Sequence, residues 1–316
     1  MKKPVLFILD PLEKLDPKTD TSLALLSELF ARGRETWAAD LKDLTADSGK
    51  AAVRASPITV QAGARFLELK SRYRPISDFG LVIIRKEPPF NEAYVTMTYL
   101  LELAPRHTFV SNNPLGIRNT NEKMGILHFP KWIPKTFISS TPELIMNFQK
   151  NLAGPVVIKP LDMKGGEGIF LLTSTGLKAK KKLLKASEGG TKPLQAQQFL
   201  QSKTFRGDKR ILLLNGRLLT SYEKVPKPGE FRANLSLGAI TRACGVTRRE
   251  KRLIDSIRPY IQKQGLHLAG IDVMQERLIE INVTCPSGLV DARLLYPELE
   301  PVKAWADFLE QKERQH

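Results

Sequence analysis

The sequence predicts a mixed α/β and α+β protein, with parallel βα units near its N-terminus and antiparallel hairpins in its second half. Two apolar runs, residues 4–9 and 80–84, are each followed by a polar loop and a helical segment, which is the order of a βα unit. After Pro155, short apolar runs alternate instead with glycine-containing turns, which favours antiparallel strand pairs. The 316 residues suffice for about two compact units that share a cleft, at roughly 150 residues each.

The chain is strongly basic, with 49 Lys and Arg against 33 Asp and Glu and a formal net charge of +16. This charge favours anionic partners, which include nucleic acid, nucleotide phosphates and carboxylate substrates. The sequence carries no RNP, helix-turn-helix or zinc-finger signature, so a catalytically silent nucleic-acid-binding protein is the weaker alternative. We therefore expect no nucleic-acid partner.

The cysteine content and the hydropathy pattern both favour the cytoplasm. Cys244 and Cys285 are far apart in the sequence, so neither a disulfide framework nor a CxxC zinc site is expected. The first apolar run ends at Asp10 and Pro11, which is too short for a secretory signal, and no run reaches the ~20 apolar residues of a membrane span. We expect a cytoplasmic protein without a membrane partner.

The first βα unit consists of the strand at 4–9 and a helix that runs to residue 30. Asp10 and Pro11 end the strand, and Thr21 with Ser22 is predicted to cap the helix. Polar residues thus follow directly on a buried strand.

The second βα unit has the same order. The strand at 80–84 leads into the polar segment 85–90, and a helix is predicted at 92–103. Because ligands bind at the carboxyl ends of strands in open α/β sheets, Asp10 and Arg85 are expected to line one crevice. Ordinary loop chemistry explains them equally well.

The central part of the chain predicts a hairpin and a basic helix. Strands at 156–159 and 169–172 flank a glycine-rich turn at 164–168. The helix at 176–187 carries a run of lysines, which is more typical of a solvated helix face than of a nucleic-acid or acidic-surface patch.

A second hairpin and a long loop follow. The Asn215-Gly216 pair between apolar runs at 211–214 and 217–222 is a strong signal for a two-residue turn. Residues 226–242 are rich in Pro, Gly and polar residues without a clear period, which predicts a loop of the kind that closes over active sites.

Three oxygen-bearing side chains are predicted to share one face of a hairpin near the C-terminus. If a three-residue turn pairs Met274 with Leu278, Asp272 lies opposite Glu280, and Asn282 falls on the same face as Glu280. Two carboxylates flanked by Ile and Val need cations or a hard metal ion to be buried, and Mg²⁺ bridging nucleotide phosphates suits this set best. The alternative is a strand pair whose polar face lies in solvent.

Lys159 and the loop at 162–168 form a weaker phosphate-binding motif. Glycines let backbone N–H groups approach phosphate oxygens, but a bare hairpin turn explains them equally well. The chain has neither a Walker A nor a Rossmann fingerprint, its four histidines have no metal-ligand spacing, and no GxSxG elbow occurs. Cys285 is more typical of a small packing residue than of a nucleophile.

Taken together, these motifs resemble those of the ATP-grasp ligases. The resemblance rests on residues 121–123, Lys159-Pro160 with the glycine loop, residues 208–210, and Asp272 with residues 280–282. The chain is more closely similar to the prokaryotic glutathione synthetases, through four segments that extend the likeness over almost the whole chain: Asp10-Pro11, 85–90, 112–123 and 229–235.

This resemblance implies an ATP-grasp fold of three parts: an N-terminal α/β substrate-binding domain at 1–120, a central lid subdomain at 121–200 and a C-terminal antiparallel-sheet catalytic subdomain at 201–316. It implies ATP as co-substrate, two Mg²⁺ ions and a homo-oligomer. The implied reaction phosphorylates the cysteinyl carboxylate of γ-glutamylcysteine, after which glycine attacks the acyl phosphate to give glutathione, ADP and phosphate.

The resemblance also implies a role for individual residues. The phosphates and the nucleotide would be held by Lys123, Lys159, Gly165, Gly166, Gln197, Gln198, Phe199, Leu200, Asp208 and Arg210. Arg210 and Arg232 would stabilise charge during catalysis, the substrates would contact Ser22, Arg85, Arg232 and Asn234, and the metal ions would bind Asp272, Glu280 and Asn282.

The chain departs from the family pattern at two sites. Met163 stands where the family has the first glycine of the phosphate loop, and residues 285–290 lack the arginine that the family supplies near the substrate, the nearest being Arg293. The second departure leaves open an alternative, an ATP-grasp ligase that joins a different amino acid or peptide pair.

Overall fold

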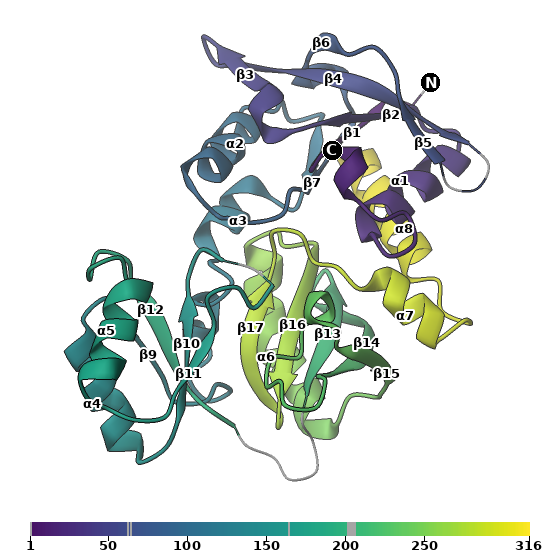
Figure 1. Cartoon of the computed structure of the whole chain (residues 1–316). Helices are drawn as coiled ribbons and strands as arrows, with labels where there is room; N and C mark the ends of the chain where they lie inside the picture. Colours follow the sequence, from purple (N-terminus) through teal and green to yellow (C-terminus); the bar gives the residue numbers. More distant parts are fainter. Residues whose placement is uncertain (1, 62, 64, 164, 201–206) are drawn as a thin grey trace.

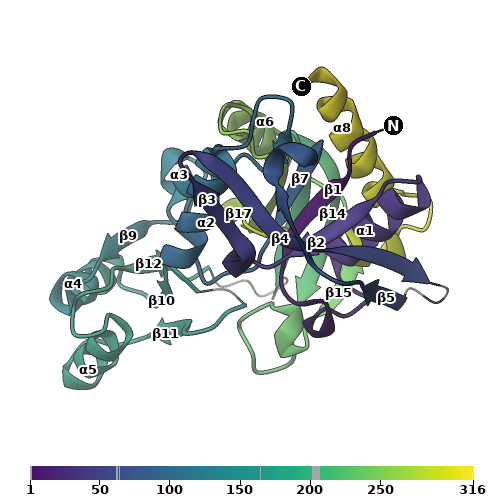
Figure 2. The same ribbon diagram turned by 90° about the horizontal axis from the view of Figure 1, so that it is seen from above.

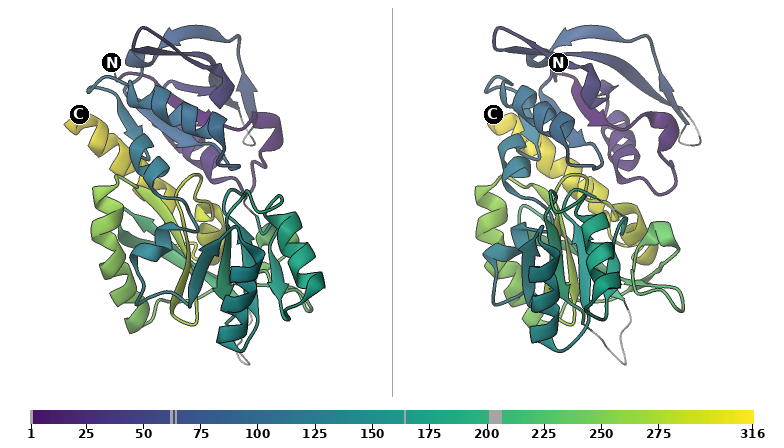
Figure 3. Two further views of the ribbon diagram at one scale, coloured as in Figure 1. Left: turned by 90° about the vertical axis from the view of Figure 1, so that its left-hand side faces the viewer. Right: turned by 60° about the vertical axis from the view of Figure 1, so that its left-hand side comes forward.

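The computed structural model describes residues 2–61, 63, 65–163, 165–200 and 207–316, which fold into three β-sheets with helices packed on their faces (Figure 1). The N-terminal sheet lies at one end of the molecule, and the other two sheets lie next to each other at the opposite end (Figure 3). None of the helices in these described ranges is both long and apolar enough to cross a membrane.

The N-terminal sheet has a parallel centre, as the two predicted βα units require. Its order is β3-β4-β2-β1-β7-β8, and β5 and β6 also pair with β4. Strand β1 is parallel to β2 and β7, and β7 is parallel to β8. The strands are β1 (Val5–Leu9), β2 (Thr36–Ala39), β3 (Leu44–Asp47), β4 (Lys50–Gln61), β5 (Arg65–Glu68), β6 (Arg72–Pro75), β7 (Leu81–Arg85) and β8 (Phe109–Ser111).

The predicted N-terminal helices are present as α1 (Thr21–Ala31) and α2 (Glu92–Glu102), and a short α3 (Pro114–Asn119) follows β8. The predicted cap of α1 is wrong by one residue. The N-cap is Asp20, whose carboxylate accepts hydrogen bonds from the backbone N–H groups of Ser22 and Leu23. An ionised carboxylate satisfies these free N–H groups and also complements the helix dipole.

The central sheet is antiparallel and confirms the first predicted hairpin. Its order is β11-β10-β12-β9, with β9 (Thr136–Ser139), β10 (Val156–Pro160), β11 (Phe170–Leu172) and β12 (Leu194–Gln198). Helices α4 (Pro142–Leu152) and α5 (Leu177–Ala186) project with it to one side of the molecule (Figure 2). Helix α5 buries Ala179 and Leu183 and turns most of its lysines to solvent, as expected for a solvated face.

The C-terminal sheet is also antiparallel, in the order β15-β14-β13-β16-β17. Its elements are β13 (Asp208–Leu214), β14 (Arg217–Val225), β15 (Ile240–Ala243), α6 (Arg248–Lys263), β16 (Leu268–Met274) and β17 (Arg277–Asn282). Asn215 and Gly216 form the predicted turn, both with positive φ. The predicted loop at 226–242 is shorter than expected, because its last residues pair with β14 as the edge strand β15.

The last two helices bring the C-terminus back to the N-terminal sheet. Helix α7 (Leu289–Leu295) follows β17, and α8 (Pro301–Gln315) packs beside α1 (Figure 1). Trp305 of α8 is buried in one cluster with Phe7 of β1 and Leu26 of α1. We propose that the three sheets correspond to the predicted units at 1–120, 121–200 and 201–316, although α8 packs with the first of them.

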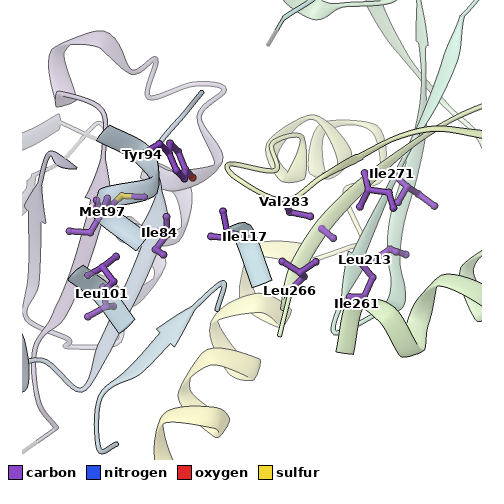
Figure 4. Close-up of a cluster of buried hydrophobic side chains, with 14 of the residues drawn as sticks. Ile84, Tyr94, Met97, Leu101, Ile117, Leu213, Ile261, Leu266, Ile271 and Val283 are labelled. Carbon is purple, nitrogen blue, oxygen red and sulfur yellow. The ribbon is translucent and has the colours of Figure 1, made fainter. Parts of the chain in front are cut away.

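A continuous apolar core joins the N-terminal and C-terminal sheets. Ile117 of α3 lies between Ile84 and Met97 on one side and Leu266 and Val283 on the other (Figure 4). All five side chains are buried. This core fixes the position of β17 and the segment that follows it.

Candidate active site

A cavity of about 240 Å³ is lined by residues of the central and C-terminal sheets. Fifteen of the seventeen predicted site residues line this cavity: Lys123, Lys159, Gly165, Gly166, Gln197, Gln198, Phe199, Leu200, Asp208, Arg210, Arg232, Asn234, Asp272, Glu280 and Asn282. The other two, Ser22 and Arg85, do not line it.

The acidic face of this cavity comes from the β16–β17 hairpin. Asp272 lies opposite Glu280, as predicted, but the predicted turn is wrong. The turn has two residues, Gln275 and Glu276, both with positive φ, and a β-bulge next to Asp272 restores the pairing. Such a bulge adds one residue to one strand and has the same effect on register as the longer turn that the sequence suggested.

Asp272 is the most heavily paired group of the site. Its carboxylate accepts two hydrogen bonds from the Arg210 guanidinium, at 2.7 and 3.2 Å, and one from Lys224 Nζ at 3.2 Å. Asn282 Nδ2 donates to it as well. Burial would raise the pKa of Asp272, but the charges of Arg210 and Lys224 outweigh burial and hold it well below its usual range.

Asp208 and Glu280 differ in how far the nearby cations compensate their burial. Burial raises the pKa of Asp208 to about 6, even though Lys224 Nζ lies 2.9 Å from its carboxylate. Burial acts in the same direction on Glu280, but Lys123 and Lys159 keep the pKa of this carboxyl below its usual value. Glu280 and Asp272 are therefore ionised near neutral pH, as metal ligands must be.

Two lysines from different elements point into the same cavity. Lys123 Nζ donates to the Met163 carbonyl oxygen at 2.6 Å and lies 3.2 Å from Glu280. Lys159 Nζ donates to Gln197 Oε1 at 2.9 Å, and its burial lowers its pKa. Burial also acts against the charge of Lys123, but Glu280 and Glu122 outweigh it and raise the pKa of this lysine.

The glycine loop, residues 162–168, bridges β10 and β11 next to these lysines. Lys164 lies outside the described residues. Gly165, Gly166 and Gly168 all have positive φ, and a Cβ on Gly168 would come within 2.8 Å of Pro160 Cγ. Glycine is therefore required at 168, and the loop can bring backbone N–H groups close to an anion.

The lid loop, residues 226–239, covers the glycine loop. Glu230 accepts hydrogen bonds from the backbone and the side chain of Arg232, and Arg232 Nη1 donates to the Gly166 carbonyl oxygen at 3.2 Å. The hydrogen bonds from Arg232 lower the pKa of Glu230 to about 2. The lid loop and the glycine loop thus meet through one arginine.

Ser22 and Arg85 do not line the cavity, but they contact each other and Arg85 contacts a segment that lines it. Arg85 Nε donates to Ser22 Oγ at 3.0 Å, and Nη1 donates to the Pro286 carbonyl oxygen at 2.9 Å. The next residue, Ser287, lines the cavity. Asp10 lies at the same edge of the sheet as Arg85, because Leu9 pairs with Arg85. Asp10 lines a second cavity that Arg85 does not line, so the common crevice of these two residues stays a prediction.

Two residues of the site were missed by the sequence analysis. Lys224 lies between Asp208 and Asp272. Glu122 is half-buried, and its carboxylate accepts hydrogen bonds from Val283 N, Thr284 N and Thr284 Oγ1, which orients the chain just after Asn282. The only sequence signal for Glu122 is its position next to Lys123, and Lys224 has none.

Asp272, Glu280 and Asn282 fit Mg²⁺ bound together with phosphates. Mg²⁺ is usually held by one or two carboxylates and the phosphates of a substrate rather than by a full protein cage. Across the described ranges, no group of three or more His, Cys, Asp or Glu side chains is arranged to hold a metal ion. Two carboxylates and an amide beside Lys123 and Lys159 match this shared mode of binding.

Family comparisons cover nearly the whole chain. Residues 4–118 match the model described as the prokaryotic glutathione synthetase N-terminal domain, and residues 122–295 match its ATP-grasp domain. The glutathione synthetase of Thermosynechococcus vestitus is 35% identical over 297 residues, which are 90% of this chain and 93% of that protein. The glutathione synthetase of Nitrosomonas europaea is 36% identical over 290 residues, 90% of each chain.

Solved structures support the same fold at lower identity. A crystal structure of D-cycloserine synthetase is 15% identical with a TM-score of 0.67, and the match covers 96% of this chain and 99% of that one. The D-alanyl-alanine synthetase A of Vibrio cholerae is 15% identical with a TM-score of 0.62, covering 100% and 98%. At this identity the likeness concerns the fold alone.

Proposed function

The chain belongs to the prokaryotic glutathione synthetase family, and from this premise we propose that it joins γ-glutamylcysteine and glycine at the expense of ATP. ATP phosphorylates the cysteinyl carboxylate, which makes a poor electrophile reactive. The neutral amino group of glycine then attacks the acyl carbon, so that a C–N bond forms as the C–O bond to phosphate breaks and the amine loses a proton. The products are glutathione, ADP and phosphate.

One observation carries this proposal: a single cavity joins two carboxylates, the buried Asp272 and the half-buried Glu280, to cations from both sheets. Lys123 and Lys159 would bind phosphate oxygens, and the N–H groups of Gly165 and Gly166 would approach them from the glycine loop. Such an arrangement suits a reaction in which negative charge moves between phosphate and carboxylate oxygens.

The nucleotide lies, in this proposal, between the two sheets. Gln197, Gln198, Phe199 and Leu200 hold the adenine through main-chain groups, and Asp208 contacts the ribose. Asp272, Glu280 and Asn282 would hold two Mg²⁺ ions, which would neutralise charge on the phosphates.

Arg210 and Arg232 stabilise the charge of the transferring phosphoryl group and of the tetrahedral intermediate. Arg210 is fixed by Asp272 on β16, whereas Arg232 is carried by the lid loop. Asn234 in the same loop contacts the substrates, and closure of the loop excludes water that would hydrolyse the acyl phosphate. Ser22 and Arg85 stay predictions as substrate contacts.

We further propose a cytoplasmic homo-oligomer. Both described cysteines are free thiols, which fits a reducing compartment. Light scattering of the purified protein gives the oligomeric state directly, and a monomeric mass would overturn this part of the proposal.

The test of the reaction is phosphate release with Mg-ATP, combined with chromatographic detection of glutathione. Release should require γ-glutamylcysteine and glycine together and should fail with either alone. Glu280→Gln is the matched blank, because it keeps the size of the side chain and removes its charge. Turnover seen only with another carboxylate and amine would refute the substrate pair and favour a ligase of different specificity.

A further inference from the structure

The lid loop carries an aromatic residue into the cavity at a point that no step of the reaction uses. Phe231 lines the cavity, and its ring packs edge-on against Phe199, with centroids 6.1 Å apart and planes at 90°. Phe199 follows β12 directly, and its N–H donates to the Pro155 carbonyl oxygen. The contact therefore joins the lid loop of the C-terminal sheet to the central sheet.

The cavity has two chemically different linings. One is charged and comprises the lysines, arginines and carboxylates described above. The other is apolar and includes Val157, Ile169, Phe199, Leu200, Met274 and Ile279, together with Phe231 itself. A nucleoside triphosphate also has a largely apolar part, the base, and a charged part, the phosphates. Its base would therefore contact the apolar lining, and its phosphates would contact the charged lining.

The position of Phe231 is fixed by its neighbours rather than by burial in a core. Its backbone N–H donates to Glu230 Oε1 at 2.9 Å. The adjacent Arg232 reaches Gly166 in the glycine loop. The Arg232 guanidinium also lies 6.0 Å from the centroid of the Phe231 ring. These two neighbouring side chains of the lid loop thus contact each other, while Arg232 reaches the glycine loop and Phe231 reaches Phe199.

We propose that Phe231 is a nucleobase-contacting residue, whose ring covers the adenine and makes closure of the lid loop depend on the base as well as on the phosphates. The proposal rests on the proposed function, because it takes ATP as the ligand of this cavity. Contact between an aromatic side chain and a base is favourable for any purine face. Phe231 therefore contributes to nucleotide affinity and to lid closure, whereas Arg232 acts on the phosphates.

The first test compares two ligands that differ only in the presence of the nucleoside. Calorimetry measures binding of ATP and of inorganic tripolyphosphate, each with Mg²⁺, to the wild type, Phe231→Ala and Phe231→Tyr. We expect Phe231→Ala to weaken ATP binding roughly tenfold and to leave tripolyphosphate binding unchanged. Phe231→Tyr keeps the ring and should bind ATP as the wild type does.

The second test follows the lid loop itself. Trypsin can cleave this loop after Arg232, whereas Lys227 is followed by Pro228 and resists cleavage. ATP should protect the wild-type loop from cleavage after Arg232 but protect Phe231→Ala far less. Equal ATP affinity and equal protection in Phe231→Ala and wild type would overturn the proposal, as would an equal loss for ATP and tripolyphosphate. Failure of the wild type to bind ATP would instead refute the proposed function, and an unchanged melting temperature of Phe231→Ala confirms that the variant folds.

Discussion

The salt bridge of Arg34 predicts a large loss of stability when this one side chain is removed. Arg34 lies between α1 and β2 with its side chain 1% exposed, and it donates two hydrogen bonds of 2.7 Å to Glu313 of α8. It also donates to the Lys3 carbonyl oxygen and to Glu310. Arg34→Met would leave Glu313 packed against Gly80 without its guanidinium partner.

The magnitude follows from the burial of the pair. Removing one partner of a buried ion pair costs about 3 to 5 kcal/mol, and Glu313 retains 12% exposure, so we take about 3 kcal/mol. For a chain of this size, each kcal/mol lowers the melting temperature by roughly 2–4 °C. We therefore expect Arg34→Met to melt about 6–12 °C lower, as measured by calorimetry or circular dichroism.

Arg32 provides the matched control, because it pairs with the same helix. Its side chain is 22% exposed, and its partners are Glu28, Asp307 and Glu310. Of these partners, Asp307 is 69% exposed, and Glu310 keeps Lys2 and Arg34 when Arg32 is removed. Exposed ion pairs contribute about 1 kcal/mol or less, so Arg32→Met, which leaves no buried charge without a partner, should lower the melting temperature by a few degrees only. If the two variants lose the same stability, burial is not what gives the Arg34 pair its strength and the reasoning fails.

Three further predictions concern pH and the site. Lys224→Met should raise the already elevated pKa of Asp208 and shift the pH profile of Mg-ATP binding upward by about one unit. Lys224→Arg should restore the wild-type profile. Identical profiles for Lys224→Met and the wild type would contradict this prediction. Glu310 has a pKa of about 2 because its cationic partners outweigh burial. Its stabilising effect is therefore complete above its usual pKa of 4.5 and is lost as the pH falls toward 2. The free energy of unfolding of Glu310→Gln should depend less on pH between these values than that of the wild type, and an equally steep dependence would contradict this prediction. If Arg85 positions Pro286, Arg85→Lys should lower kcat roughly tenfold with little change in the KM for γ-glutamylcysteine. A raised KM for γ-glutamylcysteine at unchanged kcat would instead indicate that Arg85 contacts this substrate directly.

The sequence predicted the strands that build the site better than it predicted their register. The Asn215-Gly216 turn was found from two residues, because only a few residue types tolerate its positive φ. Counting back from this turn would place Glu223 opposite Asp208. A β-bulge between Leu212 and Leu213 shifts the register by one residue and puts Lys224 there instead.

The β16–β17 hairpin also has a register that depends on a β-bulge, which the sequence did not predict. Asp272 and Glu280 were paired correctly from a turn of the wrong length, because the bulge next to Asp272 compensated for it. A bulge depends on packing against neighbouring strands and leaves no local sequence pattern. The sequence therefore shows which residues carry charge and polarity, but the exact partner of each charge is decided in the folded sheet.

Contacts between residues far apart in the sequence cannot be predicted from local patterns. In this protein such contacts join the two ends of the chain to each other and join the N-terminal sheet to the segment beside the site. Arg85 and Pro286 are 201 positions apart, and Arg34 and Glu313 are 279 apart. Thr21 Oγ1 accepts hydrogen bonds from the N–H groups of Gly288 and Leu289, and so fixes the start of α7 against α1. Because the same segment follows Asn282 and contains Ser287, Arg85 of β7 and Thr21 of α1 hold one wall of the cavity by side-chain hydrogen bonds to its backbone, without lining the cavity.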